Sequence, residues 1–403
     1  MVEVPQHLRR YIVDQNVGKY TPVDHAVWRF ILKQLRDFLS VHAHECYLDG
    51  LKKTGIHLER IPSIQEIDSR LQDFGWRAVP VSGFIPPAAF MELQSLGILP
   101  IASDMRSMST LMYTPAPDIV HEAAGHAPIL IHPEFSDYLH QYARIASKAI
   151  LARHDLEQYA AIRELSDIKE HPRSTPEQIQ AVDAKLQIIN KQIKFISEAG
   201  WLSRMNWWTA EYGLIGDIKK PKIFGAGLLS SVGESRACLS DRVIKKPLTV
   251  DCIDVGYDIT EPQPQLFVTP DFTTLSSVLR ELAAKMAYRM GGLVALRRAI
   301  QADTVNTVEY NSGLQVSGRL TDVLTDKADV PCYLRFTGSV QLAFNDLQLP
   351  GHGIDYHAHG FGSPVGRLRR TQLANVNIPD KCLSLWSEAE LRRAGILVDQ
   401  QCR

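Results

Sequence analysis

One stretch decides the fold of this chain: Tyr113-Thr114-Pro115-Ala116-Pro117-Asp118-Ile119-Val120-His121-Glu122-Ala123-Ala124-Gly125-His126. It contains two prolines, two histidines and two carboxylates in fourteen positions. The prolines hold the chain extended, because each fixes its own φ and biases the preceding residue away from the helix. Asp118 can then cap a helix that carries His121 and His126 on its first turns. Neutral imidazole is the most common protein ligand for transition metals, so both histidines are candidate ligands.

The spacing of these histidines differs from that of zinc hydrolases, whose His-Glu-x-x-His motif puts two imidazoles four residues apart on one helix face. Here the separation is five residues, and on an ideal α-helix such residues point about 140° apart. The imidazoles can meet at one ion only if the helix ends or distorts near His126, and Gly125 and Pro128 can cause such a break. From spacing alone, a metal site and a pair of structural histidines both remain open.

A third ligand is suggested farther along, where Trp201 to Gly216 is expected to form an aromatic helix. Glu211 lies there among bulky apolar neighbours, and buried acids are normally paired or bound to a metal. Two histidines and one carboxylate form the facial triad that leaves open positions on non-haem Fe(II) for oxygen chemistry. The next segment, Phe224 to Glu234, lacks the spacing of phosphate-binding loops, so its glycines are expected to allow tight turns or close backbone approach.

Composition limits the classes of partner that the chain can have. It has 403 residues, 45% of them hydrophobic and 22% charged, as in ordinary globular proteins. A formal net charge of −1 argues against nucleic acid and anionic membranes as partners. The first ten residues lack an apolar signal region, no run of about 18 apolar residues occurs, and the six cysteines form no C-x-x-C pair. We therefore expect a cytoplasmic protein.

Periodicity divides the chain in two. Residues 1–300 read as mainly helical with short strands, and residues 301–403 as a β-rich extension in which 305–310, 314–320, 332–336 and 340–344 alternate like strands. A charged helical hairpin is expected at about 150–200, with a new helix starting at Thr175-Pro176. It is expected to be a solvated surface excursion or a dimer contact, so a homodimer remains open.

Three segments, in order along the chain, resemble the pterin-dependent aromatic amino acid hydroxylases. Pro117 to His126 resembles the iron-binding motif of that family, Trp208 to Leu214 its glutamate-bearing segment, and Gly225 to Glu234 its substrate-side segment. The resemblance covers about residues 20–290. It implies a mainly α, aromatic amino acid hydroxylase-like catalytic domain with short strands, to which the β-rich extension is added.

The resemblance also implies roles for individual residues. Iron would be held by His121, His126 and Glu211, and Arg106 would pair with the carboxylate of the substrate. The other positions expected at the substrate are Tyr113, Thr114, Pro117, Trp207, Ser230 and Glu234. Those expected at the pterin are Gly83, Phe84, Ile85, Phe90 and Glu122.

The implied activity is ring hydroxylation of an aromatic amino acid, in which Fe(II) and a tetrahydropterin such as tetrahydrobiopterin activate O₂. Phenylalanine, converted to tyrosine, is the expected substrate, with tryptophan as the alternative. The alternative hypotheses for its function are a 2-oxo-acid-dependent iron oxygenase and a non-catalytic amino-acid sensor. The chain departs from the animal enzymes in its long His126–Glu211 spacing and in Asn206, which replaces an aromatic residue.

A second histidine group lies in the extension, in Pro350-Gly351-His352-Gly353-Ile354-Asp355-Tyr356-His357-Ala358-His359-Gly360. On a strand, the His357-x-His359 pair would point to one face and could bind a metal. A glycine-rich loop with surface histidines is the favoured interpretation.

Overall fold

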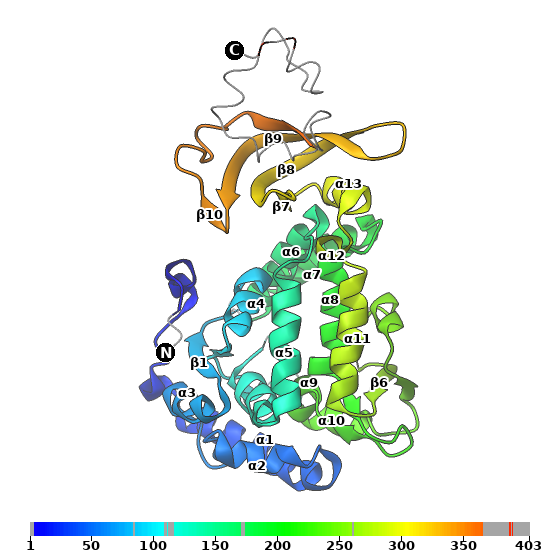
Figure 1. Cartoon of the computed structure of the whole chain (residues 1–403). Coiled ribbons are helices and arrows are strands. Elements are labelled where there is room, and N and C mark those ends of the chain that lie inside the picture. The colour runs from blue at the N-terminus through cyan, green and yellow to red at the C-terminus, as the bar shows by residue number, and fades with distance from the viewer. Residues whose placement is uncertain are drawn as a thin grey trace. The chain divides into compact units, whose positions relative to one another are not determined.

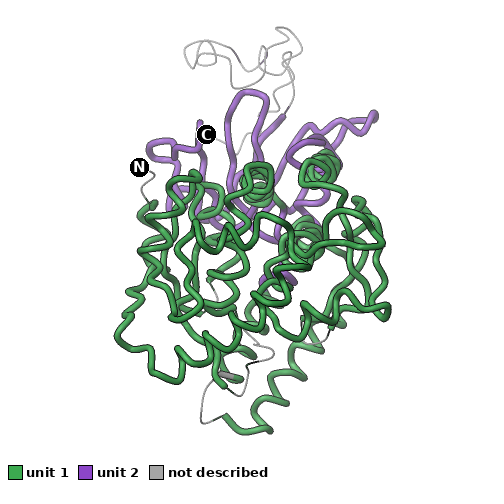
Figure 2. The backbone as a smooth tube through the Cα atoms, turned by 90° about the horizontal axis from the view of Figure 1, so that it is seen from below, with its two compact units in different colours: residues 1–149, 157–284 green, residues 150–156, 285–403 purple. Residues whose placement is uncertain are grey.

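The computed structural model describes residues 4–83, 85–108, 111, 117–170, 174–259, 262–365, 387 and 389. The structure is 51% helical and 18% strand, which confirms a mainly α fold with a β-rich C-terminal part. The chain forms two compact units (Figure 2). The first comprises residues 1–149 and 157–284, and the second residues 150–156 and 285–403.

Helices make up most of the first unit (Figure 1). They are α1 (Pro22–His42), α2 (Cys46–Lys53), α3 (Ile64–Leu71), α4 (Pro87–Ser95), α5 (Pro133–Ala146), α6 (Arg153–Glu170), α7 (Pro176–Gln192), α8 (Glu198–Asn206), α9 (Ala226–Leu229), α10 (Val232–Ala237) and α11 (Phe272–Ala284). Short 3₁₀ segments are η1 (Gln6–Tyr11), η2 (Val17–Lys19), η3 (Gln72–Phe74), η6 (Ala127–Ile131) and η8 (Val250–Asp254), and two π-helical segments are η5 (Val120–His126) and η7 (Trp207–Glu211). The long helices α5 and α11 pack side by side.

The start of α1 is set by its sequence. Thr21 accepts the backbone N–H of Asp24, the Asp24 carboxylate accepts the N–H of Thr21, and Pro22 occupies the first turn. The residues that α1 buries are Val27, Trp28, Ile31, Leu32, Leu35 and Leu39, which recur at the helical period. One face of the helix therefore belongs to the core of the unit.

Two small sheets complete the first unit. The strands are β1 (Arg77–Val81), β2 (Ile98–Ala102), β3 (Leu214–Ile215), β4 (Lys222–Ile223), β5 (Ile244–Pro247) and β6 (Gln265–Thr269). β1 and β2 pair in parallel, and the other four form a sheet in the order β4-β3-β6-β5. All five residues of β2 are buried, and β2 contacts η5. The sheets thus support the segments that carry the expected ligands.

The expected helical hairpin is present as α6 and α7. Thr175 caps α7 in a capping box with Gln178, and Pro176 follows in the first turn, as predicted. An exposed Lys185–Glu164 ion pair and a Gln158–Asn190 hydrogen bond join the two helices. Exposed ion pairs contribute little to stability, so the Lys185–Glu164 pair adds little to the hairpin.

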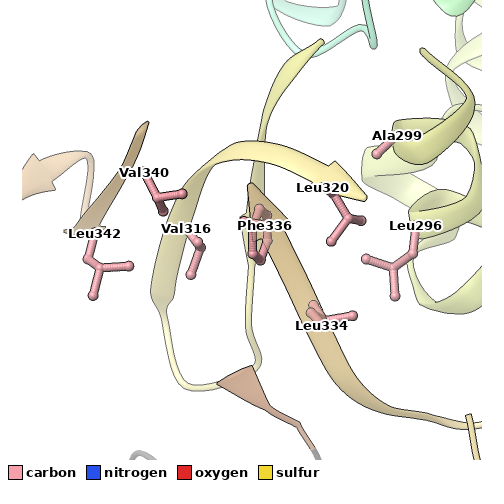
Figure 3. Close-up of a cluster of buried hydrophobic side chains, with 8 residues drawn as sticks. All are labelled: Leu296, Ala299, Val316, Leu320, Leu334, Phe336, Val340 and Leu342. Carbon is pink, nitrogen blue, oxygen red and sulfur yellow. The ribbon is translucent and has the colours of Figure 1, made fainter. Parts of the chain in front are cut away.

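The second unit is built on an antiparallel sheet. It contains α12 (Ala287–Met290), α13 (Gly292–Ala302), β7 (Val305–Glu309), β8 (Leu314–Thr325), β9 (Pro331–Phe344), β10 (Leu347–Gln348) and β11 (Gly360–Pro364). The strand order is β10-β9-β8-β7, and β11 also pairs with β9. Its core lies between one face of α13 and the sheet (Figure 3). The buried residues are Leu296, Ala299, Val316, Leu320, Leu334, Phe336, Val340 and Leu342.

One detail of this sheet differs from the sequence-based expectation. Residues 332–336 and 340–344, expected as two strands, belong to the single strand β9. Ser317 pairs with Gln341 but Arg319 pairs with Thr337, so β9 accommodates extra residues where Gly338 adopts a φ of +74°.

None of the helices in the described residues has the length and apolar character needed to cross a bilayer.

Candidate active site

His121 and His126 lie on η5, which is wound as a π-helix from Val120 to His126. A π-helix closes i→i+5 hydrogen bonds, which brings residues five apart onto the same face. The two imidazole rings accordingly lie 5.0 Å apart, edge to face. The predicted distortion near His126 is therefore present, and it extends over the whole segment rather than only its end.

Glycines allow the neighbouring segments to approach η5 and η7 closely. A Cβ added at Gly125 would lie 2.7 Å from the carbonyl oxygen of Ala226, on α9. A Cβ added at Gly225 would lie 2.5 Å from the carbonyl oxygen of Glu211. The glycine-rich segment that begins at Phe224 thus permits backbone to pack on backbone beside both histidines and the glutamate.

Glu211 ends η7, and its carboxylate faces both histidines. Its Oε2 lies 3.3 Å from Nε2 of His121, and its Oε1 lies 3.3 Å from Nε2 of His126. One ligand atom from each of the three side chains lies within 4.8 Å of the others, and no other group of three such residues is found in the described part of the chain. Their side chains are only 17%, 5% and 16% exposed for His121, His126 and Glu211 respectively.

Electrostatics keep Glu211 ionised. Burial raises the pKa of its carboxyl, but the charges of His126 and His121 and their hydrogen bonds outweigh burial and hold the pKa well below its usual range. An ionised carboxylate is the form that a metal ion requires.

The tautomer of His121 follows from its neighbour Ser230. Ser230 Oγ donates to the carbonyl of Ala226 at 2.7 Å, so it acts as the acceptor for Nδ1–H of His121 at 3.1 Å. Because Ser230 engages Nδ1–H, Nε2, which faces Glu211, is the nitrogen that would bind a metal ion in place of a proton. The donor set is therefore two imidazole nitrogens and one carboxylate, all converging, which fits a non-haem iron ion.

Arg106 is fixed by Asp118 in a buried ion pair. Nε and Nη2 of Arg106 each lie 2.7 Å from an Asp118 oxygen, and the backbone N–H of Arg106 donates to the same carboxylate at 3.0 Å. Asp118 also accepts the backbone N–H of His121 at 3.1 Å, which is the cap expected from sequence. Nη1 of Arg106 also donates to the carbonyl of Ser230, at 3.4 Å.

Of the other expected substrate-side residues, Pro117 is half-buried just before Asp118, and Tyr113 and Thr114 lie outside the described residues. Trp207 stacks on the rings of Tyr212 and Tyr257, each with its centroid 4.4 Å away. Two rings this close would collide on one face of the indole, so they cover opposite faces. Trp207 can therefore present only its edge to a bound ring.

Glu234 is partly buried, and its carboxylate accepts a short hydrogen bond from the Tyr212 hydroxyl. Burial raises the pKa of Glu234, and the bond from Tyr212 opposes that rise. Glu234 is thus tied to the ring that supports Trp207.

The expected pterin-side residues come from three elements. Gly83 has a φ of +59° and donates its N–H to Asp104, whereas Phe84 lies outside the described residues. Ile85 packs against a core cluster that includes Leu93, and Phe90 is half-buried on α4.

Glu122, the remaining expected pterin-side residue, is buried on η5 beside His121. Burial raises the pKa of its carboxyl to about 8; the charge of His126 opposes that rise, while Glu211 and Asp118 add to it. Its Oε2 has no hydrogen-bond partner among the described residues. A protonated Oε2 is therefore available as a hydrogen-bond donor at neutral pH.

Sequence reasoning missed three contributors to the site. Asp118 was recognised as a cap but not as the partner of Arg106. Tyr257, which stacks on Trp207, lies in a segment without any motif. Asn206 was noticed only as a departure from the animal enzymes, although its amide reaches Glu211.

The histidines of the extension do not form a three-ligand group. His352 Nδ1 and His357 Nε2 lie 3.1 Å apart with nearly parallel rings, and His359 is exposed. Within the described residues, this arrangement fits the favoured interpretation of a loop with surface histidines.

Known proteins share this architecture. A family model described as biopterin-dependent aromatic amino acid hydroxylase matches residues 9–162 and 196–312, leaving out most of the α6–α7 hairpin. The phenylalanine-4-hydroxylase of Pseudomonas aeruginosa is 28% identical over 282 residues, which are 70% of this chain and 90% of that protein. The chloroplastic phenylalanine 4-monooxygenase of Pinus taeda is 30% identical over 216 residues, 53% of this chain and 48% of that protein.

A solved structure of a phenylalanine hydroxylase also resembles this chain. The phenylalanine hydroxylase of Chromobacterium violaceum, with bound iron(III) and 7,8-dihydrobiopterin, superposes with a TM-score of 0.54 and 25% identity. The match covers 71% of this chain and 94% of that one.

Proposed function

Since this chain belongs to the biopterin-dependent aromatic amino acid hydroxylase family, we propose that it is an Fe(II)- and tetrahydropterin-dependent monooxygenase that hydroxylates L-phenylalanine to L-tyrosine with O₂. The observation that carries the proposal is the convergence of His121, His126 and Glu211 on one point. The names of the bacterial and plant relatives support phenylalanine as the substrate. Tryptophan is the second candidate, because few residues decide the choice of ring.

In this proposal, His121, His126 and Glu211 would hold the iron, the histidines through Nε2 and the glutamate through a carboxylate oxygen. When bound, iron and reduced pterin supply the activation of O₂ that amino-acid side chains cannot perform. The contribution of the protein is to orient these groups. Ser230 fixes the ring of His121 through Nδ1, and the π-winding of η5 keeps both imidazoles on one face.

The substrate carboxylate is proposed to bind the Nη1–Nη2 edge of Arg106. Asp118 holds the opposite edge, so the guanidinium is already oriented before the amino acid arrives. Such pre-orientation reduces the entropy that binding would otherwise cost. Thr114 and Tyr113 are proposed to assist, with Pro117, the edge of Trp207, Ser230 and Glu234 completing the substrate side.

Gly83, Phe84, Ile85 and Phe90 are proposed as residues that would hold the pterin. Glu122 is proposed to donate a hydrogen bond to it. The support for this role is the buried, unpaired Oε2, which carries a proton at neutral pH in the metal-free protein.

The remaining proposals concern the whole chain. Residues 1–300 are proposed to contain the catalytic domain, and 301–403 to be an extension; the family match, which ends at residue 312, supports this division. The hairpin at about 150–200 is proposed as an insertion that could provide a homodimer contact.

We also place the enzyme in the cytoplasm, because Cys46, Cys238, Cys252 and Cys332 are free thiols.

Product analysis tests the proposal. Purified protein is loaded with Fe(II), supplied with tetrahydrobiopterin and O₂, and given phenylalanine, tyrosine or tryptophan in parallel. We expect tyrosine to form from phenylalanine. Hydroxylation of tryptophan alone would overturn the substrate proposal, and hydroxylation of none of the three would overturn the activity.

A further inference from the structure

Asn206 stands five residues before Glu211, at the junction between α8 and η7. Its backbone is helical, with φ −59° and ψ −45°, so η7 continues directly from α8. The π-winding of η7 brings residues five apart onto one face, as it does for His121 and His126 on η5. The amide nitrogen Nδ2 of Asn206 consequently lies 3.4 Å from Oε1 of Glu211, the one acceptor that it reaches among the described residues.

The two oxygens of Glu211 have different surroundings. Among the described residues, Oε2 pairs with His121, whereas Oε1 pairs with His126 and also accepts from the Asn206 amide. A hydrogen bond to an ionised carboxylate is stronger than one between neutral groups, so the amide can restrain the carboxylate. At 3.4 Å the bond is long, and both oxygens of the metal-free carboxylate are also drawn toward imidazole nitrogens at 3.3 Å.

We propose that Asn206 is a positioning residue that retains Oε1 of Glu211 and thereby presents Oε2 to the metal. This inference rests on the proposed iron site. An amide suits the task because it donates without adding charge, so the site keeps the single negative charge of Glu211. By restraining one oxygen, Asn206 also prevents the carboxylate from occupying two metal positions, which preserves the open positions that the chemistry needs.

The effect of Asn206 should be measurable on the metal itself, apart from turnover. Partners that orient a ligand typically change metal affinity by about 10- to 100-fold. Asn206→Leu keeps the approximate size of the side chain and removes its donor. We expect this variant to bind Fe(II) about tenfold more weakly in competition with a chelator. The visible d–d bands of bound Co(II), which report the number and arrangement of ligands, should also differ from those of the wild-type protein.

Asn190→Leu is the matched control, because it makes the same change at an exposed position on α7, where Asn190 bonds to Gln158 rather than to Glu211. It should retain both the Fe(II) affinity and the Co(II) spectrum of the wild type. Asn206→Ala is a second test variant, and circular dichroism of the metal-free proteins establishes that each has folded. The inference is overturned if a folded Asn206 variant keeps wild-type Fe(II) affinity within twofold and an unchanged Co(II) spectrum.

The same titrations distinguish this inference from the proposed iron site. If the wild-type protein binds Fe(II) and Glu211→Ala does not, the site stands whatever the Asn206 variants do. If the wild type binds no Fe(II), the site fails and the role of Asn206 fails with it.

Discussion

Arg106 and Asp118 form a buried two-point ion pair, in which Nε reaches Oδ2 and Nη2 reaches Oδ1, each at 2.7 Å. Their side chains are 3% and 4% exposed. The pair links the loop after β2 to the start of η5, because Asp118 also accepts the backbone N–H of His121. The orientation of the proposed substrate-binding arginine is thus coupled to the position of a proposed iron ligand.

Breaking this pair should destabilise the protein. Asp118→Asn keeps the shape of the side chain but leaves the guanidinium of Arg106 as a buried charge without its counterion. The expected loss in the free energy of unfolding is about 3 kcal/mol or more. Urea unfolding of the metal-free protein measures it. Asp37→Asn, which removes an exposed partner of Arg36, is the control and should change stability by less than about 1 kcal/mol. Equal stability of Asp118→Asn and wild type would contradict the account.

Arg106→Lys should weaken amino acid binding more than it slows the reaction. Lysine keeps the positive charge but cannot grip Asp118 and the substrate carboxylate with two planar edges. We expect KM for phenylalanine to rise about tenfold, equivalent to about 1.4 kcal/mol, with a smaller change in kcat. Steady-state kinetics at saturating tetrahydrobiopterin separates the two constants. An unchanged KM would show that Arg106 does not hold the substrate.

Gly125→Ala should separate η5 from α9. The added Cβ would lie 2.7 Å from the carbonyl oxygen of Ala226, which belongs to rigid backbone, so the two segments must move apart. Overpacking of this kind typically costs about 1–3 kcal/mol. Fe(II) affinity should fall too, because His126 follows Gly125 directly. Thermal and urea unfolding measure the first effect, and chelator competition the second.

The control for this substitution is Gly18→Ala, whose added Cβ meets only Asn16 Oδ1 at 3.7 Å. That variant should be close to wild type in both measurements. A Gly125→Ala protein with wild-type stability and Fe(II) affinity would mean that the contact with Ala226 is not needed for the site.

Sequence could predict the triad because each ligand lies in a short segment with its own local pattern. It could not predict the π-winding of η5, because a π-helix has no composition of its own. The segment also packs closely on distant backbone, since Gly125 meets Ala226, which is 101 residues away in the chain. The pairing of Arg106 with Asp118 escaped prediction for a related reason, since it closes a loop whose path no local pattern fixes.

In the β-rich extension, alternation of apolar and polar residues identified the strands, but it predicted residues 332–336 and 340–344 as two strands where the structure has one. A glycine with positive φ can instead absorb extra residues inside one continuous strand, and only the pairing of β9 with β8 distinguishes these cases.

Glu122 should make the stability of the metal-free protein depend on pH. Burial raises its pKa from an ordinary value of 4.5 to about 8, so the folded protein binds the proton more tightly than the unfolded chain does. Its contribution to stability is therefore complete below pH 4.5 and is lost as the pH rises toward 8. Glu122→Gln cannot ionise. Between about pH 5 and about pH 8, its free energy of unfolding should therefore fall less than that of the wild type.

Urea unfolding at a series of pH values tests this difference. Glu45→Gln, at an exposed position, should follow the wild-type curve. If the curves of Glu122→Gln and wild type run parallel, Glu122 is not held as the neutral acid, and its proposed role as a donor to the pterin is lost.

The most direct test of the central claim compares wild type with Glu211→Ala in one assay. Each protein is given Fe(II), tetrahydrobiopterin, O₂ and phenylalanine, and bound iron and tyrosine are both measured. The account predicts about one iron per wild-type chain with tyrosine as product, and loss of both in Glu211→Ala, because one of three ligands is gone. Undiminished iron binding and tyrosine formation by Glu211→Ala would contradict it.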